Sequence, residues 1–510
     1  MIGRAARASV AALAAVTLAA CAPSLEPLGA PEVRPRTPAS VAAAVSALRA
    51  DLAAIFGAPG VDHAQWSVTV QSLDQGDTLY SLNAHRLQVP ASVQKLLVAG
   101  VAAERLGWGF QFTTRIYATG PIDADGVLDG HLVVTSDGDP TINPRHPQRW
   151  GALDDWAKQL AATGLRQVAG ELVGDDSRFA EPGWGLGWAW DDLARGYGAP
   201  VGALQYNENQ VEVMIGPGQG AGDRAIISLS PLGSGLVVDH GVTTVAAGGD
   251  TRVTLERIPG SNLLSIRGQV AADARPRSEF VGVSNPTQMY VNALREALAR
   301  NGIFVGGNAT DIDDLRTPPD LSKASLLLED RSPLLAEIID VMLKWSRNGY
   351  AETLLRALAR PEPSATADTG LAALAQTLGY FGIPPGHYLA RDGSGLSRYD
   401  YLTADAAAWL LTYMYLDPAH ATNFRNALPV AGVSGTIEDR LKGSPAEGRV
   451  WAKTGSMSQV RSLAGYLVTA ANEPLVFAII VNGARIPGRE VDAVMDRALV
   501  RLAGFNRAGR

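Results

Sequence analysis

The apolar pattern of the chain changes twice, and these changes limit the folds that it can adopt. Between about residues 112 and 282, short apolar runs such as Leu132–Thr135, Val211–Ile215 and Leu263–Val270 are separated by Gly, Asp and Pro, a pattern typical of β-strands. Both flanks alternate longer helical patterns with strands. The sequence therefore predicts an α/β (α+β) unit formed by residues 41–111 and 283–510, interrupted by a β-rich insertion at residues 112–282.

Individual elements in the two flanks can be predicted from their periodicity. A hairpin is expected at Trp66–Leu73 and Thr78–Asn83, because alternating residues flank the turn-forming stretch 74–77. Further strands are expected at Arg449–Lys453, Ser462–Thr469 and Leu475–Val481. Helices are expected at Ser40–Phe56, Val93–Leu106, Pro286–Asn301, Pro333–Leu358 and Glu490–Leu502.

Composition excludes several classes of protein. The 510 residues are 46% hydrophobic and 19% charged, which is enough apolar material for a large core and excludes a disordered chain. The net charge is −7 and no basic block is present, which argues against a nucleic-acid-binding protein. The only cysteine is Cys21, so a disulfide within the chain and a cysteine metal site are excluded.

The N-terminus has the pattern of an export signal. In residues 1–20, Arg4 and Arg7 precede a short apolar run that is too short to span a bilayer well. The following Leu-Ala-Ala-Cys ends at Cys21 and resembles a bacterial lipobox, in which the thiol is acylated; ordinary signal cleavage near Ala20 is the alternative. Five prolines in residues 21–40 are typical of an extended tether. We expect an exported protein of the periplasm or cell envelope, anchored through a lipid on Cys21.

The most informative short pattern is Ser92-Val93-Gln94-Lys95. Residues i and i+3 of a helix share a face, so the Ser92 hydroxyl and the Lys95 amine can meet. A serine needs a neighbouring base to become a nucleophile, and a buried lysine with a lowered pKa can be that base. Only six of the 44 basic residues are lysines, and because arginine cannot act as a base, each lysine position is a candidate for proton transfer. The alternative is a surface lysine on an ordinary helix.

Two later patterns complete a possible active site. Ser346-Arg347-Asn348 offers a hydroxyl for proton transfer and an amide that could bind a substrate backbone, although Ser-x-Asn alone is very common. Lys453-Thr454-Gly455-Ser456 follows an apolar strand and could bind a carboxylate, with Gly455 allowing a substrate to lie close to the strand. By itself this second pattern could equally be the end of a strand and its turn.

Taken together and in this order, the three patterns are the signature of penicillin-binding proteins and serine β-lactamases. The long stretch between Ser92 and Ser346 resembles the D-alanyl-D-alanine carboxypeptidase/endopeptidase family of class C low-molecular-mass penicillin-binding proteins (penicillin-binding protein 4 type, peptidase family S13), which carry large insertions there. Similar stretches extend over most of the chain, namely LQVPASVQK (87–95), GDPT (138–141), PGWGLGWAWDDL (182–193), DGSGLS (392–397), LPVAGVSGT (428–436) and AKTGSMSQVRSLAGY (452–466).

This resemblance implies a fold and a set of roles. The two flanks would form a penicillin-binding-protein/serine β-lactamase-like transpeptidase domain. Ser92 would be the acylated nucleophile and Lys95 its base, while Ser346 and Lys453 would pass a proton to the leaving D-alanine. The remaining roles would be substrate binding: the substrate amide by Asn348, the terminal carboxylate by Thr454 and Ser456 beside Gly455, and the side chain of the stem peptide by Asp175 and Met457.

The expected function is that of a serine D,D-peptidase that cleaves peptidoglycan stem peptides as a carboxypeptidase, an endopeptidase or both, and that β-lactams inhibit by acylating Ser92. No metal or cofactor is expected, since the histidines show no ligand spacing. One alternative is a β-lactamase or esterase on the same fold. A second is a catalytically weak, lipid-anchored protein that binds the cell wall. The sequence leaves the oligomeric state and the choice of membrane open.

Overall fold

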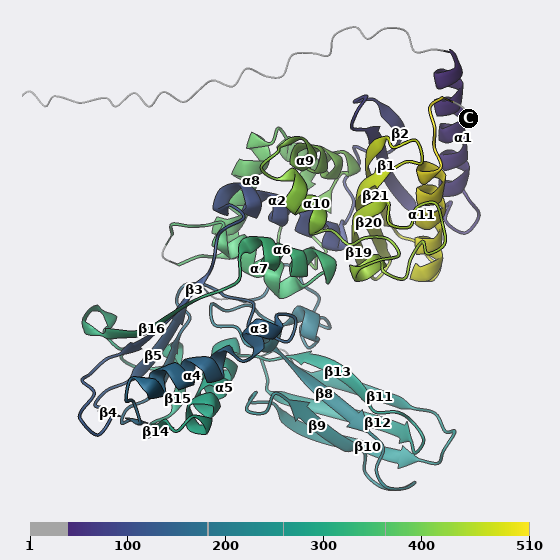
Figure 1. Ribbon diagram of the computed structural model, residues 1–510. Coiled ribbons are helices and arrows are strands. Elements are labelled where there is room, and N and C mark those ends of the chain that lie inside the picture. Colours follow the sequence, from purple (N-terminus) through teal and green to yellow (C-terminus); the bar gives the residue numbers. More distant parts are fainter. Residues whose placement is uncertain (1–38, 181–182, 259, 363, 509–510) are drawn as a thin grey trace, which may run out of the picture.

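The computed structural model describes residues 39–180, 183–258, 260–362 and 364–508. The expected signal peptide, the tether up to residue 38 and Cys21 lie outside these residues. Within them, the strands gather into separate sheets that are connected by a central group of helices (Figure 1). No helix among the described residues combines the length and the apolar character that crossing a bilayer would require.

One antiparallel sheet joins the two ends of the chain. Its order is β19-β20-β21-β1-β2, so β1 of the N-terminal hairpin pairs with β21, which follows it by more than 400 residues in the sequence. The hairpin and the C-terminal strands form as predicted from their alternation. The bounds are β1 Gln65–Ser72, β2 Thr78–Leu82, β19 Val450–Met457, β20 Val460–Val468 and β21 Pro474–Asn482.

Helices cover both faces of this sheet. On one face, α1 (Ala39–Phe56) and α11 (Gly488–Ala503) pack against each other and against an apolar core that includes Leu52, Phe477 and Met495. On the other face, a second core surrounds α2 and is formed with α6 to α10. These helices are α2 Lys95–Leu106, α6 Leu335–Lys344, α7 Asn348–Ala357, α8 Ala367–Tyr380, α9 Ala404–Leu416 and α10 Ala421–Asn426.

The helix expected at Pro333–Leu358 is wrong as a single element. It consists of α6 and α7, which are separated by residues 345–347. The cause is Ser346, whose φ of 56° places it in the left-handed region that an α-helix cannot contain. The break turns the Ser346 side chain out of the helical register, and Asn348 begins the next helix.

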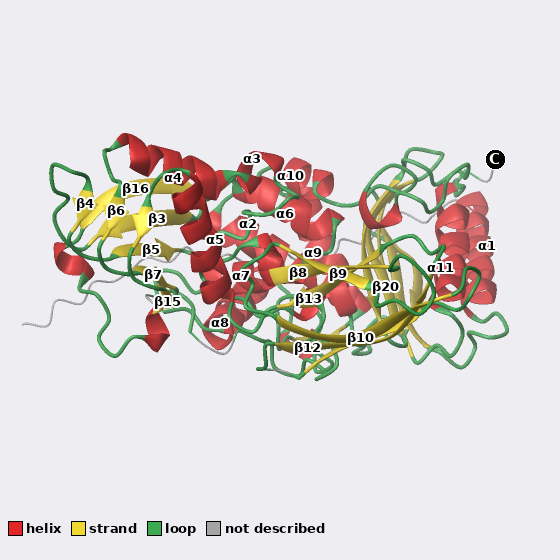
Figure 2. Cartoon of the chain, turned by 90° about the horizontal axis from the view of Figure 1, so that it is seen from below, coloured by secondary structure: helices red, strands yellow, loops and turns green. Residues whose placement is uncertain are grey.

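The region between α2 and α6 contains the remaining larger sheets. A mixed sheet has the order β15-β7-β5-β3-β16 and packs against α4 (Ala152–Ala162) and α5 (Pro286–Arg300), and the short α3 (Pro147–Trp150) precedes α4 (Figure 2). Its strands are β3 Thr113–Ala118, β5 Leu132–Ser136, β7 Leu172–Asp175, β15 Ala309–Asp311 and β16 Ser325–Arg331. A small parallel sheet beside it contains β4 Val127–Leu128, β6 Gln167–Val168 and β14 Phe304–Val305.

Two three-stranded sheets face each other across a further apolar core. They contain β8 Gln210–Gly216, β9 Ile226–Ser230, β10 Val237–Val245, β11 Arg252–Arg257, β12 Leu263–Ala271 and β13 Arg277–Gly282. A two-stranded ribbon pairs β17 (Tyr388–Leu389) with β18 (Tyr401–Leu402).

The pairing of β16 with β3 indicates that the insertion ends later than residue 282. Beyond the expected boundary at residue 282, α5 packs on the inserted sheet and β16 pairs antiparallel with β3. We therefore propose that the inserted region extends from about residue 112 to about residue 332, and that residues 41–111 and 333–510 form the transpeptidase-like domain. The short connections on either side, at Phe112 and Ser332, are joined by a hydrogen bond from Phe112 N to Ser332 Oγ of 2.9 Å.

The apolar core between the five-stranded sheet and the helices α1 and α11 can be tested at Phe477, on the central strand β21. Phe477 is fully buried, so Phe477→Ala would leave a cavity and is expected to lower the free energy of unfolding by roughly 3–5 kcal/mol. Phe304→Ala, at a side chain that is 63% exposed on β14, is expected to change it by less than about 0.5 kcal/mol. Chemical denaturation measures both values, and equal effects of the two variants would contradict the assignment of this core.

Candidate active site

The structure brings the three sequence patterns together. Ser92 lies in the 3₁₀ turn Ala91–Gln94 that leads into α2, Ser346 and Asn348 lie at the break between α6 and α7, and Lys453 lies on β19. A cleft of about 510 Å³ opens where these elements meet, and its lining includes Ser92, Ser346 and Asn348. Lys95 and Lys453 are fully buried and are not among the residues that line the cleft.

Lys95 is held by three polar contacts. Its Nζ lies 2.8 Å from Ser92 Oγ, 2.7 Å from Asn348 Oδ1 and 2.6 Å from the carbonyl oxygen of Ser394. A neutral amine has two hydrogens and one lone pair. It can therefore donate to the two carbonyl-type oxygens, which are only acceptors, and accept from the serine hydroxyl. This arrangement suits a base that removes the proton of Ser92.

Burial also favours the neutral amine. Complete burial lowers the pKa of Lys95 to about 7, and the carboxylates of Asp392 and Glu352 oppose this shift. At a pH slightly above neutral, a large share of the Lys95 side chains is therefore uncharged. The geometry and the pKa thus point to the same protonation state.

The carbonyl oxygen of Ser394 that contacts Lys95 belongs to the loop at residues 392–397, and hydrogen bonds hold this loop in position. Glu352 Oε1 accepts hydrogen bonds from the backbone N–H groups of Gly393 (3.0 Å) and Ser394 (2.9 Å), and Asp392 Oδ1 accepts one from Gly395 N (2.7 Å). Burial raises the pKa of Glu352 to about 7, with a further contribution from Asp392. Sequence reasoning missed Glu352, because nothing in the chain marks a buried glutamate on α7 as a support for a distant loop.

Gly395 shows how closely this loop approaches the nucleophile. Its φ is 78°, which favours glycine, and a Cβ at this position would overlap the carbonyl oxygen of Ala91. Ala91, directly before Ser92, also has a positive φ of 47°. The turn that presents Ser92 is therefore held in an uncommon backbone conformation by the packing around it.

Ser346 and Lys453 form a second serine–lysine pair. Lys453 Nζ lies 2.8 Å from Ser346 Oγ and donates to the carbonyl oxygen of Thr454 at 2.6 Å. Burial lowers the pKa of Lys453 well below its usual value, and the positive charge of Lys95 adds to this effect. The two lysines therefore disfavour each other's charge, so a proton on one makes a proton on the other less favourable.

The Gly455 position allows β19 to lie against the nucleophile turn. A Cβ there would lie 2.8 Å from Pro90 O and 3.0 Å from Ser92 N, and Ser462 Oγ donates to Pro90 O at 2.6 Å. The next residue, Ser456, lines the cleft together with Met457. Thr454 points to Thr436, with 2.8 Å between their hydroxyl oxygens.

The structure does not place Asp175 in this cleft. Asp175 ends β7 in the inserted sheet, pairs with Thr135 of β5 and accepts a hydrogen bond from Ser177 N, and it is not among the residues that line the cleft. Asp191 and Asp192 line it instead. Both belong to the stretch PGWGLGWAWDDL, whose resemblance to the family was already noted in the sequence. Asp175, in Gly174-Asp175-Asp176-Ser177, was nevertheless selected from the sequence as the substrate-binding carboxylate.

Tyr197 connects these carboxylates with the serine–lysine pairs. Its hydroxyl donates to Asp192 Oδ1 at 2.7 Å, and its carbonyl oxygen accepts from Asn348 Nδ2 at 2.9 Å. Asn348 thus contacts Lys95 through its carbonyl oxygen and Tyr197 through its amide nitrogen. Sequence reasoning missed Tyr197, because a single tyrosine in a Gly-rich stretch carries no specific signal.

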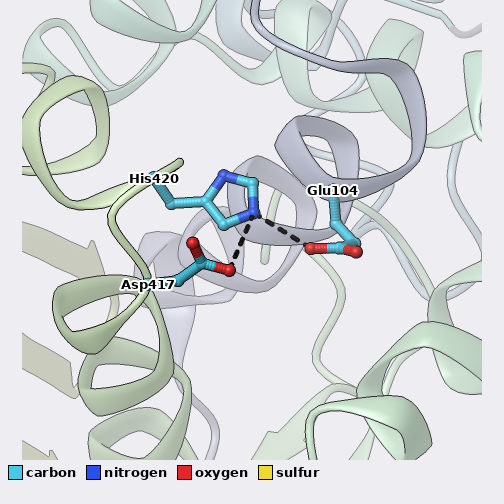
Figure 3. Close-up of side chains that lie close together, drawn as sticks. All are labelled: Glu104, Asp417 and His420. Atoms are coloured by element: carbon cyan, nitrogen blue, oxygen red, sulfur yellow. Dashed lines mark hydrogen bonds and ion pairs between the residues drawn. The ribbon is translucent and has the colours of Figure 1, made fainter.

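A group of possible metal ligands lies elsewhere, at Glu104, Asp417 and His420 (Figure 3). His420 Nε2 lies 2.9 Å from Glu104 Oε2, and its Nδ1 accepts a hydrogen bond from Trp108 Nε1 at 3.1 Å. With Nδ1 as the acceptor, the neutral ring carries its proton on Nε2, where it is donated to Glu104. This tautomer fits a structural hydrogen bond better than metal ligation, which would need the lone pair of Nε2.

Comparison with known proteins gives consistent matches over nearly the full described length. A family model described as "D-Ala-D-Ala carboxypeptidase 3 (S13) family" matches residues 48–503. The chain is 33% identical over 476 residues to a D-alanyl-D-alanine carboxypeptidase of Actinomadura sp. strain R39, covering 91% of this chain and 86% of that protein. It is 28% identical to the D-alanyl-D-alanine carboxypeptidase DacB of Haemophilus influenzae, covering 81% of this chain and 84% of that protein.

Solved structures show the same relationship. A crystal structure of penicillin-binding protein 4 from Haemophilus influenzae matches with a TM-score of 0.76 and 27% identity, covering 89% of this chain and 97% of that one. A structure of the same protein complexed with a β-lactam matches with a TM-score of 0.70 and 25% identity, covering 89% and 98% of the two chains. The predicted fold class, with its interrupted transpeptidase-like domain, is thereby confirmed.

The lowered pKa of Lys95 predicts the pH dependence of acylation. If neutral Lys95 is the base, the second-order rate constant for reaction with a penicillin rises with pH through a midpoint near 7 and falls roughly tenfold for each pH unit below it. Stopped-flow or quench measurements with labelled penicillin give this profile. Lys442→Met, at a lysine paired with Asp439 on the surface, should leave the midpoint unchanged, and a rate constant that stays flat between pH 5 and 9 would contradict the assignment.

Proposed function

The chain belongs to the D-Ala-D-Ala carboxypeptidase (S13) family, and we propose that it carries out the reaction of that family through an acyl-enzyme on Ser92. The function is that of a serine D-alanyl-D-alanine carboxypeptidase, with peptidoglycan stem peptides as substrates and β-lactams as covalent inhibitors. The observation that carries the assignment of the nucleophile is the 2.8 Å contact between Ser92 Oγ and the buried Lys95 Nζ.

Acylation begins when Lys95 removes the hydroxyl proton of Ser92. The Ser92 oxygen then attacks the carbonyl carbon of the penultimate D-alanine and forms a tetrahedral intermediate. Its oxyanion is placed to accept hydrogen bonds from the backbone N–H groups of Ser92 and Ser456, since the approach at Gly455 sets β19 beside the Ser92 turn. Lys95 carries the additional proton at this stage, in the place where three oxygens surround its Nζ.

The second pair serves the leaving group. Breaking the C–N bond requires a proton on the amine of the terminal D-alanine, which Ser346 Oγ supplies while Lys453 Nζ returns one to Ser346. The substrate carboxylate, bound near Thr454 and Ser456, favours the charged Lys453 that this step needs. Transfer of the proton from Lys95 back to Lys453 resets the two lysines, and water then hydrolyses the Ser92 ester.

The carboxylates of the cleft suit the free amine of a stem-peptide diamino acid. We assign this contact to Asp191 and Asp192, which line the cleft, rather than to Asp175. Met457 lines the same cleft and supplies an apolar contact for the aliphatic part of that side chain.

Mass mapping of a penicillin adduct tests the nucleophile. Incubation with labelled penicillin is expected to yield one adduct, located on the peptide that contains Ser92, and Ser92→Ala is expected to abolish it. Ser81→Ala serves as the matched control, because Ser81-Leu82-Asn83 is another Ser-x-Asn sequence and its serine lies on β2, outside the residues that line the cleft. Label that persists in Ser92→Ala, or that maps to another residue, would refute the assignment.

The cellular location follows from the N-terminal pattern. We propose that the chain is exported to the periplasm or cell envelope and held at a membrane by a lipid on Cys21, with residues 22–38, before α1 begins, as the tether. In cells fed radioactive palmitate, the full-length protein should incorporate label and sediment with membranes, whereas Cys21→Ser should do neither. A soluble, unlabelled wild-type protein would instead support ordinary signal cleavage near Ala20.

A further inference from the structure

A second and larger hollow lies next to the catalytic cleft. It has a volume of about 910 Å³, and we call it the distal hollow. Tyr197 lines both cavities, and Arg347, which lies between Ser346 and Asn348 in the sequence, lines the distal hollow. The two cavities therefore adjoin each other at Tyr197, near the α6–α7 break. The side chains that define the distal hollow are Arg145, Arg195, Tyr197, Phe280, Trp345 and Arg347.

Arginines outnumber carboxylates by three to two in the lining of the distal hollow, although the chain as a whole has a net charge of −7. Arg145 Nε lies 3.2 Å from Glu208 Oε1, and Arg347 forms an ion pair with the other oxygen of the same carboxylate. Two guanidinium groups thus share one carboxylate, and Arg195 adds a third positive charge. The other carboxylate of the hollow, Glu279, is paired with Arg277 at 2.9 Å.

Three aromatic side chains line the distal hollow. Tyr197, Phe280 and Trp345 are 50%, 48% and 44% exposed, so each ring is partly accessible to a ligand. The Arg145 guanidinium lies over the Trp345 ring, 5.2 Å from its centroid, and is thereby held in place between the ring and Glu208. A guanidinium that is already oriented loses less entropy when it binds an anion.

Together, the two cavities present charges of opposite sign on either side of Tyr197. The catalytic cleft is lined by two carboxylates, Asp191 and Asp192, and one arginine, Arg398, whereas the distal hollow is lined by three arginines and two carboxylates. A substrate that carries a free amine and a free carboxylate close to each other would match this pattern. Stem peptides have this character, because the diamino acid is preceded by an acidic residue.

We propose that the distal hollow binds the free carboxylate of the acidic residue that precedes the diamino acid in the stem peptide. The carboxylate contacts Arg195 and Arg145, and the adjoining backbone packs on the rings of Tyr197 and Trp345. This subsite rests on the proposed function, since it extends the same substrate beyond the acylation cleft. It makes the enzyme selective for stem peptides in which this carboxylate is free rather than amidated.

The direct test compares two peptides that differ in one group. Both are stem pentapeptides ending in D-Ala-D-Ala, one with D-glutamate and the other with D-isoglutamine, so that a carboxylate is replaced by an amide of nearly the same shape. We expect kcat/KM of the wild-type enzyme to be about three- to tenfold higher for the D-glutamate peptide, the size of effect that partly exposed charge-assisted contacts produce. Equal kcat/KM values would overturn the proposal.

Variants then locate the source of the preference. Arg195→Gln and Arg145→Gln are each expected to reduce the ratio of the two kcat/KM values toward one. Arg115→Gln removes an arginine of similar exposure that pairs with Glu329 on the inserted sheet, and it should keep the wild-type ratio. The stoichiometry of penicillin labelling confirms that each variant retains a folded active site. A preference that persists unchanged in both hollow variants would overturn the proposal.

The failure of this subsite can be distinguished from the failure of the proposed function. A short Nα-acetyl-lysyl-D-Ala-D-Ala tripeptide keeps the free side-chain amine but lacks the acidic residue, so it reports on the acylation cleft alone. Cleavage of the tripeptide, combined with equal rates for the two pentapeptides, would overturn the subsite only. An enzyme that cleaves none of the three peptides and is not labelled by penicillin would overturn both.

Discussion

The burial of the Lys95 amine is the constraint on which the rest of the site depends. A charged ammonium group is costly to hold in a fully buried position, whereas a neutral amine needs only two acceptors and one donor. Those partners come from three separate parts of the chain, namely Ser92 in the same turn, Asn348 on α7 and Ser394 in the 392–397 loop. The fold must therefore bring these parts together before Ser92 can react.

Several otherwise unusual features of the structure serve this convergence. The positive φ of Ser346 breaks the α6–α7 segment, so Ser346 and Asn348, only two residues apart, can contact different lysines. The buried Glu352 carboxylate accepts hydrogen bonds from the backbone N–H groups of Gly393 and Ser394, and these bonds orient the Ser394 carbonyl toward Lys95. Glycines at 395 and 455 let that loop and β19 lie against the nucleophile turn. Each feature costs conformational freedom that the surrounding core offsets.

Sequence patterns predicted the local part of this arrangement well. The spacing of Ser92 and Lys95 implied their contact, and alternation identified the hairpin and strands that complete the five-stranded sheet. Long-range partners were harder to predict, because Glu352 and Tyr197 contribute through contacts with segments far away in the sequence. Asp175 was singled out instead of Asp191 and Asp192 because a carboxylate in a Gly-Asp motif resembles a site residue until its sheet position is known. The end of the insertion was also obscured, since α5 has an ordinary amphipathic pattern that does not reveal which sheet it covers.

The protonation state of Lys95 can be measured directly, because the chain contains only six lysines. Enzyme labelled with ¹⁵N and ¹³C at the lysine side chains would give few NMR signals, and Lys95→Met would identify the one from Lys95. Its titration is expected to have a midpoint near pH 7, well below the value of about 10.4 of a lysine in a model peptide. A Lys95 signal with a midpoint near the model-peptide value of about 10.4 would show a charged amine at neutral pH, and it would contradict the role of Lys95 as the base for Ser92.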